Sequence, residues 1–242
     1  MKLKSLILLP GFAAVCLYSQ LTLADNWLLG IEGGYASRSG TLNSRTEPSV
    51  AFGSQHLSDN GGVYGVLGGY QWNLDDHWLA GLEANFDWNS MDELRAFNYV
   101  AADGVTPVGE GARYDRDWTL GLSGRLGYRV HTQALPFDML PYVRVGAEVN
   151  DDELTIERYA TLTGALTNSN TRDKHTFAWL AGAGIEFPLI DHLVLRGEYD
   201  YSRSQRVKLE NVSANTAGTF TGFYDYRPHT HTGKLQLVWN FC

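Results

Sequence analysis

Cysteine is almost absent from this chain, with 2 residues in 242. One is Cys16, in an apolar N-terminal stretch, and the other is the last residue, Cys242. Once that stretch is removed a single cysteine remains, which excludes a disulfide-bonded scaffold and leaves Cys242 without an evident role. Proline is scarce as well, with 7 residues, whereas glycine reaches 26 and aromatic residues 12%. This composition favours a folded chain over a disordered one.

Long apolar runs are also missing beyond the N-terminus. No stretch of about 18 uninterrupted apolar residues follows residue 24, so no helical membrane span is expected. Basic residues number 19 against 27 acidic ones, and this acidic balance argues against nucleic acid as a partner. The sequence contains no zinc-type cysteine cluster and no phosphate-binding loop, so we expect neither a cofactor nor a metal.

The first 24 residues have the pattern of a secretory signal peptide. Lys2 and Lys4 form a basic head, and a mostly apolar core extends from Leu6 to Leu17. Thr22 and Ala24 supply the small residues that a signal peptidase needs before Asp25. We expect residues 1–24 to be removed and residues 25–242 to form the mature domain. A lipoprotein signal at Cys16 is a weaker alternative, because Val15 stands where a small residue is required.

Apolar and polar residues alternate in eight segments of the mature chain. In the last segment Leu235, Leu237 and Trp239 share one face, while Lys234 and Gln236 share the other. A period of two marks a strand with one apolar and one polar face. Each segment supplies the roughly 9–11 residues that a tilted strand needs to cross a bilayer. The segments are residues 26–36, 62–73, 78–89, 118–130, 142–149, 176–187, 193–202 and 233–241.

Aromatic residues stand at both ends of four of these segments. They form two heights, as in the aromatic girdles of membrane barrels at the two lipid–water interfaces. A soluble sandwich would bury its apolar faces and would give aromatic residues no reason to favour segment ends. The pairs are Trp27 and Tyr35, Tyr64 and Trp72, Trp78 and Trp88, and Trp118 and Tyr128.

Short and long connections alternate between the segments. Residues 73–77, 131–140 and 188–192 are short, whereas residues 37–61, 90–115, 150–174 and 203–228 each hold about two dozen residues. An open sheet edge in hydrocarbon costs several kcal/mol for each unpaired amide, so the last strand must pair with the first. The sequence therefore predicts an all-β fold, an eight-stranded antiparallel transmembrane β-barrel with short periplasmic turns and four long extracellular loops.

The strand motifs resemble those of a known family. Gly30-Ile-Glu-Gly-Gly-Tyr35, Gly65-Val-Leu-Gly-Gly-Tyr70-Gln-Trp72 and Gly182-Ala-Gly-Ile-Glu186 are similar to motifs of outer-membrane β-barrels such as opacity-type porins and the membrane domain of outer membrane protein A. The resemblance covers residues 25–242 and implies residence in the outer membrane of a Gram-negative bacterium. It also implies a C-terminal signal for the barrel assembly machinery, carried by Lys234, Trp239 and Phe241. The chain departs from that signal at Gln236, where glycine is expected, and at Cys242, which extends past the final aromatic residue.

Charged residues dominate the polar faces of the strands and are expected inside the barrel. Eight strands enclose a lumen that side chains can fill, and unpaired charges there would be costly, so we predict a network of ion pairs. The network either plugs the barrel or lines a narrow ion path. Its predicted members are Glu32, Glu83, Asp87, Arg125, Arg129, Arg144, Glu148, Glu186, Arg196, Glu198, Asp200 and Lys234.

Catalysis has one candidate segment, His229-Thr-His231 near the outer end of the last strand. Both histidines face the same way, with Glu198 or Asp200 as candidate orienting groups, and they would meet lipid headgroups. No serine follows them in the pattern of a barrel lipid deacylase. A metal site with His175 is disfavoured, because one strand separates that residue from the pair. We expect polar residues at a strand end and no enzyme.

The leading functional hypothesis is a non-enzymatic surface barrel that acts through its extracellular loops, with an opacity-like role in adhesion or interaction, or a structural role in the envelope. Expected partners are outer-membrane lipid, the assembly machinery, and host or environmental ligands. A small porin-like channel is the alternative, and a lipid-modifying enzyme is a third. Aromatic residues expected to be exposed in the loops are Phe97, Tyr99, Tyr159, Phe220, Phe223, Tyr224 and Tyr226.

Overall fold

The computed structural model describes residues 26–47, 51–100, 107–131, 138–159, 166–213 and 221–241. The predicted signal peptide and Cys242 lie outside these residues. All regular secondary structure in the described chain is β-strand. The described residues form no helix that is long and apolar enough to cross a membrane.

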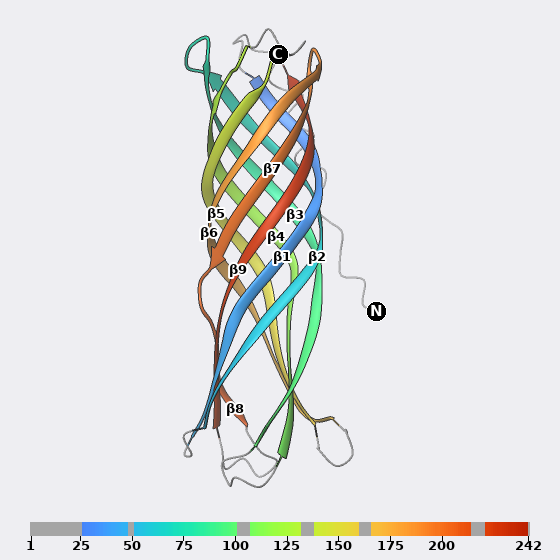
Figure 1. Cartoon of the computed structure of the whole chain (residues 1–242), viewed down its shortest axis with the longest axis vertical. Coiled ribbons are helices and arrows are strands. Elements are labelled where there is room, and N and C mark those ends of the chain that lie inside the picture. Colours follow the sequence, from blue (N-terminus) through green and yellow to red (C-terminus); the bar gives the residue numbers. More distant parts are fainter. Residues whose placement is uncertain are drawn as a thin grey trace.

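The strands form one closed antiparallel sheet that winds around a common axis (Figure 1). Neighbours in sequence pair from β1 to β7, and β9 pairs with both β7 and β1, which closes the sheet. The predicted closed barrel is thereby confirmed. Its strands are β1 (Asn26–Glu47), β2 (Ala51–Asn73), β3 (Trp78–Val100), β4 (Pro107–Tyr128), β5 (Leu140–Tyr159), β6 (Leu166–Ile190), β7 (Leu193–Ser204), β8 (Val207–Ser213) and β9 (Thr221–Phe241).

The nine strands occupy eight positions around the barrel, here called walls, because β7 and β8 are two parts of one interrupted strand. β7 pairs with β9 from Leu193 to Arg203, and β8 pairs with the outer part of β9 from Val207 onward. The break falls at Gln205 and Arg206, where the Gln205 N–H donates a hydrogen bond to the Phe177 carbonyl oxygen at 2.8 Å. The predicted count of eight barrel strands therefore holds, with one strand interrupted.

The four segments expected as long loops are mostly strand, which corrects that expectation. β1 and β2 stay paired from Asn26–Gln71 outward to Thr46–Ala51, and β3 to β6 extend in the same way. Antiparallel pairing satisfies the backbone groups of these segments even where their side chains do not alternate strictly. Walls of 20–25 residues exceed the roughly 9–11 that a crossing needs, so the barrel continues beyond the membrane.

The membrane-facing surface carries the apolar faces of the strands. Leu29, Ile31 and Val145 are examples, with exposed fractions of 46%, 62% and 65%. Rings of aromatic residues bound this band: Trp27, Trp72 and others face outward near the short turns, and Tyr35, Tyr64 and Trp88 near the opposite end. The end of the described chain at Phe241 lies on the same side as the short turns (Figure 1). These turns are periplasmic in bacterial barrels, so the strand extensions point outward.

Apolar side chains fill the lumen at both ends. Near the periplasmic turns, Leu28, Leu67, Val194 and Val238 form one cluster, and Leu79, Leu140 and Tyr142 form another. The strand extensions enclose a larger cluster, here called the outer core. Two aromatic residues expected to be exposed in loops, Tyr224 and Tyr226, are buried in it. The outer core consists of Leu42, Leu57, Ala112, Tyr114, Leu154, Ile156, Val207, Tyr224 and Tyr226.

Candidate functional site

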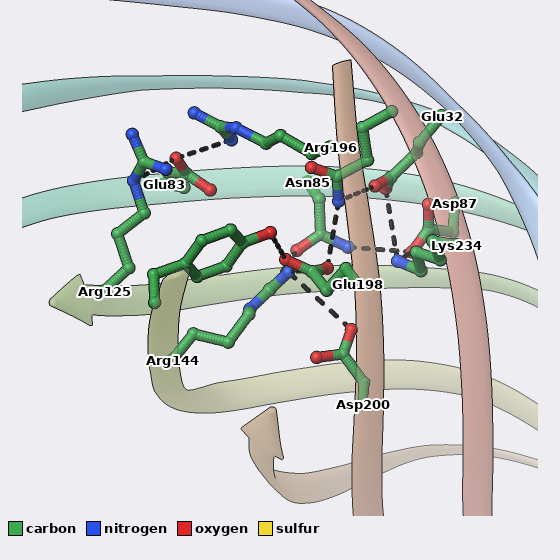
Figure 2. Close-up of polar contacts among 12 residues, drawn as sticks. Glu32, Glu83, Asn85, Asp87, Arg125, Arg144, Arg196, Glu198, Asp200 and Lys234 are labelled. Atoms are coloured by element: carbon green, nitrogen blue, oxygen red, sulfur yellow. Dashed lines mark hydrogen bonds and ion pairs between the residues drawn. The ribbon is translucent and has the colours of Figure 1, made fainter. Parts of the chain in front are cut away.

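Two arginines and two glutamates form a closed ring in the periplasmic half of the lumen, here called the inner ion-pair ring. The Arg125 guanidinium lies 2.9 Å from Glu83 Oε1 and 2.9 Å from Glu186 Oε2. Arg196 contacts the same two carboxylates, at 2.9 Å and 2.8 Å. The four residues come from β3, β4, β6 and β7, so the ring ties together strands that are not adjacent. Figure 2 shows Glu83 between Arg125 and Arg196.

A second cluster continues the network toward the outer half of the barrel. Lys234 Nζ lies 2.8 Å from Asp87 Oδ2 and 3.3 Å from Glu32 Oε1. The Gln236 amide donates hydrogen bonds of 2.9 Å to both Glu32 and Glu198. The Asn85 amide donates to Asp87 at 2.8 Å (Figure 2). Gln236 therefore connects Glu32 to Glu198, and both amides add hydrogen-bond donors to carboxylates that already contact a cation.

Arg144 extends the second cluster, and Tyr142 links this cluster to the inner ion-pair ring. Its Nη1 lies 2.5 Å from Glu198 Oε1 and 3.7 Å from Asp200 Oδ2. Glu198 also accepts a hydrogen bond of 2.8 Å from the Tyr142 hydroxyl, as Figure 2 shows. The Tyr142 ring lies 5.4 Å from the guanidinium carbon of Arg125, so a cation–π contact joins the apolar periplasmic cluster to the ionic layer.

The structure places eleven of the twelve predicted lumen residues in the interior and buries them. Arg129 differs. Its guanidinium lies at the first periplasmic turn, 3.3 Å from the Asp76 carbonyl oxygen and 3.4 Å from Asn73 Oδ1. Arg129 directly follows the last residue of β4, so its side chain reaches the barrel rim and not the lumen. The buried residues are Glu32, Glu83, Asp87, Arg125, Arg144, Glu148, Glu186, Arg196, Glu198, Asp200 and Lys234.

A third layer of ion pairs, on the periplasmic side of the outer core, was not predicted from the sequence. Arg38 lies 3.0 Å from Asp59 and stacks 4.3 Å from the centre of the Tyr114 ring. Arg116 lies 2.8 Å from Asp152. Arg38, Asp59 and Asp152 fall in segments expected to be loops, and Arg116 lies between the loop segment 90–115 and the strand segment 118–130, so none of them was assigned an inward face. In β1 and β5 the even-numbered residues face the lumen. Extending this alternation beyond the outer aromatic ring would have predicted that Arg38 and Asp152 also face the lumen.

The remaining space in the lumen is small. A cavity of about 20 Å³ lies between the Lys234 cluster and the Arg116 layer, with Glu148, Asp87 and Asp200 in its wall. A second cavity of about 10 Å³ lies beside Arg38 and Tyr226. A water molecule needs about 10–15 Å³ by this measure, so these cavities have room for single waters.

Burial raises the pKa of Tyr226 to about 12, which keeps its hydroxyl neutral in the outer core.

The two candidate catalytic histidines lie on the outside of the barrel, beyond the outer aromatic ring. His229 Nε2 lies 2.9 Å from Ser39 Oγ, and His231 Nδ1 lies 2.5 Å from the Tyr199 hydroxyl. Among the described residues, no carboxylate forms an ion pair with either histidine, so the Ser39–His229 pair lacks the orienting acid of a hydrolase triad. Glu198 and Asp200, the candidate orienting groups, face the lumen instead.

Metal binding finds no support in the same region. His175 lies on β6 and pairs with Asp151 at 3.1 Å, away from His229 and His231 on β9. Within the described part of the chain, no group of three or more metal-ligating side chains comes together.

The residues proposed for the assembly signal divide between two surfaces. Lys234 points into the lumen, whereas Trp239 and Phe241 face outward and are each 42% exposed. Phe241 pairs with Trp27 of β1 at the periplasmic end of the closing seam. The proposed signal therefore lies at the seam where the barrel closes.

Comparisons with known proteins agree with this architecture. A model of the outer membrane protein beta-barrel domain matches residues 11–241. The 31 kDa outer-membrane immunogenic protein of Brucella melitensis is 24% identical over 222 residues, which cover 88% of this chain and 82% of that protein. The protein of the same name from Brucella suis matches equally well.

Among solved structures, OprG shows the same fold. OprG from Pseudomonas aeruginosa has a TM-score of 0.50 at 14% identity, covering 89% of this chain and 96% of its own. The attachment invasion locus protein Ail of Yersinia pestis has a TM-score of 0.29 at 13% identity, covering 85% and 97%. The chain belongs to the outer membrane protein beta-barrel family, and it resides in the outer membrane of a Gram-negative bacterium.

Proposed function

We propose that this protein is a closed, non-conducting and non-enzymatic barrel that displays its outer end for interaction at the cell surface. The observation that carries the proposal is the filled lumen: three ionic layers lie between apolar clusters at the two ends. Function then falls to the surfaces outside the lumen, as is common for sites displayed on a rigid scaffold.

The ion pairs argue against the porin alternative. An ion crossing the lumen would have to separate Arg125 and Arg196 from Glu83 and Glu186, each of which is nearly or fully buried. Leaving a buried charge without its partner costs about 3–5 kcal/mol. Beyond this ring the ion would meet the outer core, which offers few polar groups to replace its water shell.

A lipid-modifying activity is the less favoured third candidate. Ser39 and His229 lie at hydrogen-bond distance on the lipid side of the wall, as a nucleophile and base would. Burial, together with the neighbouring His231 and Arg203, lowers the pKa of His229. A catalytic histidine needs the opposite environment, because it must carry a positive charge in the transition state.

The outer end is the part of the molecule that meets the surroundings. The strand extensions and the outer core hold it rigid, so the connections at its rim start from fixed positions. The Brucella relative is named as immunogenic, which by analogy supports surface exposure.

The test replaces the rim connections, residues 48–50, 101–106, 160–165 and 214–220, with Gly-Ser linkers of equal length in the full chain. Cells that express each form are measured for attachment to epithelial cells and to immobilised matrix proteins, with heat-shifted gel mobility as the folding check. Loss of attachment with a folded barrel supports an interaction role. Unchanged attachment removes adhesion and leaves the envelope-structural role, which is then measured as detergent sensitivity of a deletion strain.

A further inference from the structure

On one side of the barrel the outward-facing residues change from apolar to polar near the outer aromatic ring. On this side, made of β7, β9 and β1, Gly233 pairs with Tyr199 on one flank and with Tyr35 on the other. His231 and His229 follow on the same face of β9. At about 3.3 Å per residue, they lie roughly 7 and 13 Å along the strand from Gly233. This is the level at which lipid headgroups replace acyl chains.

Hydrogen-bond donors gather at that level and form a set here called the outer patch: Arg203, His229, His231, Ser39 and Tyr199. Arg203 of β7 is the register partner of His229, and Ser39 of β1 is its partner on the other side. Arg203 is exposed and the two histidines are half-buried. The short contacts to Ser39 and Tyr199 hold both imidazole rings in place.

Arg203 gives the outer patch a permanent positive charge, whereas the outward residues of β5 at the corresponding end are acidic. On β5 the outward residues beyond Val149 are Asp151 and Glu153, and Asp151 pairs with His175 of β6. The outer patch therefore differs in charge from the described outward residues of β5.

Three glycines lie on the lipid-facing surface on the periplasmic side of the outer patch. Gly233 sits between the two tyrosines, and Gly33 and Gly197 flank Leu235 in the next row. A methyl group added at any of these three glycines would meet no other atom within 4 Å, so each marks open space on the lipid side. These three glycines, here called the glycine track, leave the backbone on either side of the exposed Leu235 uncovered, so an acyl chain can lie against it next to the outer patch.

We propose that the outer patch binds a phosphate group on the headgroup of an outer-leaflet lipid, with one of the lipid's acyl chains on the glycine track. Arg203 suits this role because its planar guanidinium can donate two parallel hydrogen bonds to phosphate oxygens. His229, His231 and Ser39 add donors from the neighbouring strands. The track and the membrane-facing position favour a lipid over a free anion, because only a lipid uses both features.

The test measures binding of diphosphorylated lipid A to the purified, folded barrel in mixed detergent micelles. The Arg203→Gln/His229→Gln double variant is compared with His175→Gln, which removes an outward histidine of β6 that lies outside the outer patch and pairs with Asp151. Loss of charge-assisted hydrogen bonds predicts at least about tenfold weaker binding for the double variant and no change for the control. Arg203→Lys should retain part of the affinity, and Gly233→Leu should weaken binding by blocking the track.

Three results would overturn the proposal, provided that heat-shifted mobility shows each variant to be folded. The first is equal affinity of the double variant and the unmodified barrel. The second is equal binding of lipid A from which both phosphates have been removed, which would assign the affinity to the apolar wall alone. The third is competition by inorganic phosphate at the concentration of the lipid, which would make the ligand a soluble anion.

Discussion

Arg196 of β7 reaches across the lumen to Glu83 of β3, with 2.9 Å between Nη1 and Oε1. These two strands stand four walls apart in a barrel of eight, so the pair spans the full width of the interior. A single ion pair of this length is possible only because the lumen is narrow enough for side chains to fill it. The pair therefore shows that side chains from opposite strands meet and fill the lumen at this height.

Removing one member of the inner ion-pair ring should destabilise the barrel strongly. Glu83→Gln leaves Arg125 and Arg196 to share a single carboxylate, and the unfolding free energy should fall by about 3–5 kcal/mol. The measurement is urea unfolding of the refolded barrel in lipid vesicles, followed by heat-shifted mobility. Asp225→Asn is the matched control, because its pair with Arg206 is exposed and should contribute below about 1 kcal/mol. Similar losses in both variants would contradict the ring's assigned role.

The outer core should behave like the core of a soluble protein. Leu154 is fully buried within it, so Leu154→Ala should cost about 2–5 kcal/mol through lost burial and the cavity left behind. Leu74→Ala, in the exposed first turn, should change the unfolding free energy by less than about 0.5 kcal/mol. If Leu154→Ala were equally harmless in the same urea titration, the strand extensions would not enclose a packed core.

Close approach between β1 and β9 requires glycine at one position and not at the next. A methyl group at Gly34 would overlap the Gly233 carbonyl oxygen, so Gly34→Ala should cost about 1–3 kcal/mol at the closing seam. Gly33→Ala meets no atom within 4 Å and should leave stability nearly unchanged. The two variants are compared by the urea midpoint of heat-shifted mobility. Equal midpoints would mean that the seam is looser than the register of β1 and β9 indicates.

The membrane-spanning part of the fold was predictable because its two faces lie in different environments. Outward residues such as Leu235 face lipid and must be apolar, whereas inward residues such as Lys234 contact polar side chains in the lumen. A shift of the strand by one residue would place Lys234 in lipid and Leu235 in the lumen. Outside the membrane that constraint ends. The segments around Arg38, Tyr114 and Tyr226 have water outside and both charged and apolar side chains inside, so their apolar residues do not follow a regular period of two and the segments resemble loops in the sequence.

The partners within the lumen could not be predicted in the same way. Parity places Glu83 and Arg196 inside, but the relative height of β3 and β7 depends on the stagger of the closed barrel, which no single strand encodes. The network also contains Gln236, which bridges Glu32 and Glu198, and Asn85, which donates to Asp87; neither was predicted as a member because neither carries a charge. The outer patch was visible only in part, because Ser39 and Arg203 meet His229 through strand pairing alone.

The most direct test of the closed lumen is single-channel conductance of the refolded mature barrel in a planar bilayer. Heat-shifted mobility of the same preparation establishes that the protein is folded. The filled lumen predicts an electrically silent bilayer across the voltage range in which the membrane itself is stable. Reproducible openings whose conductance changes in the Glu83→Gln variant would contradict it, because they would show ions passing through the layer that Glu83 and Arg196 close.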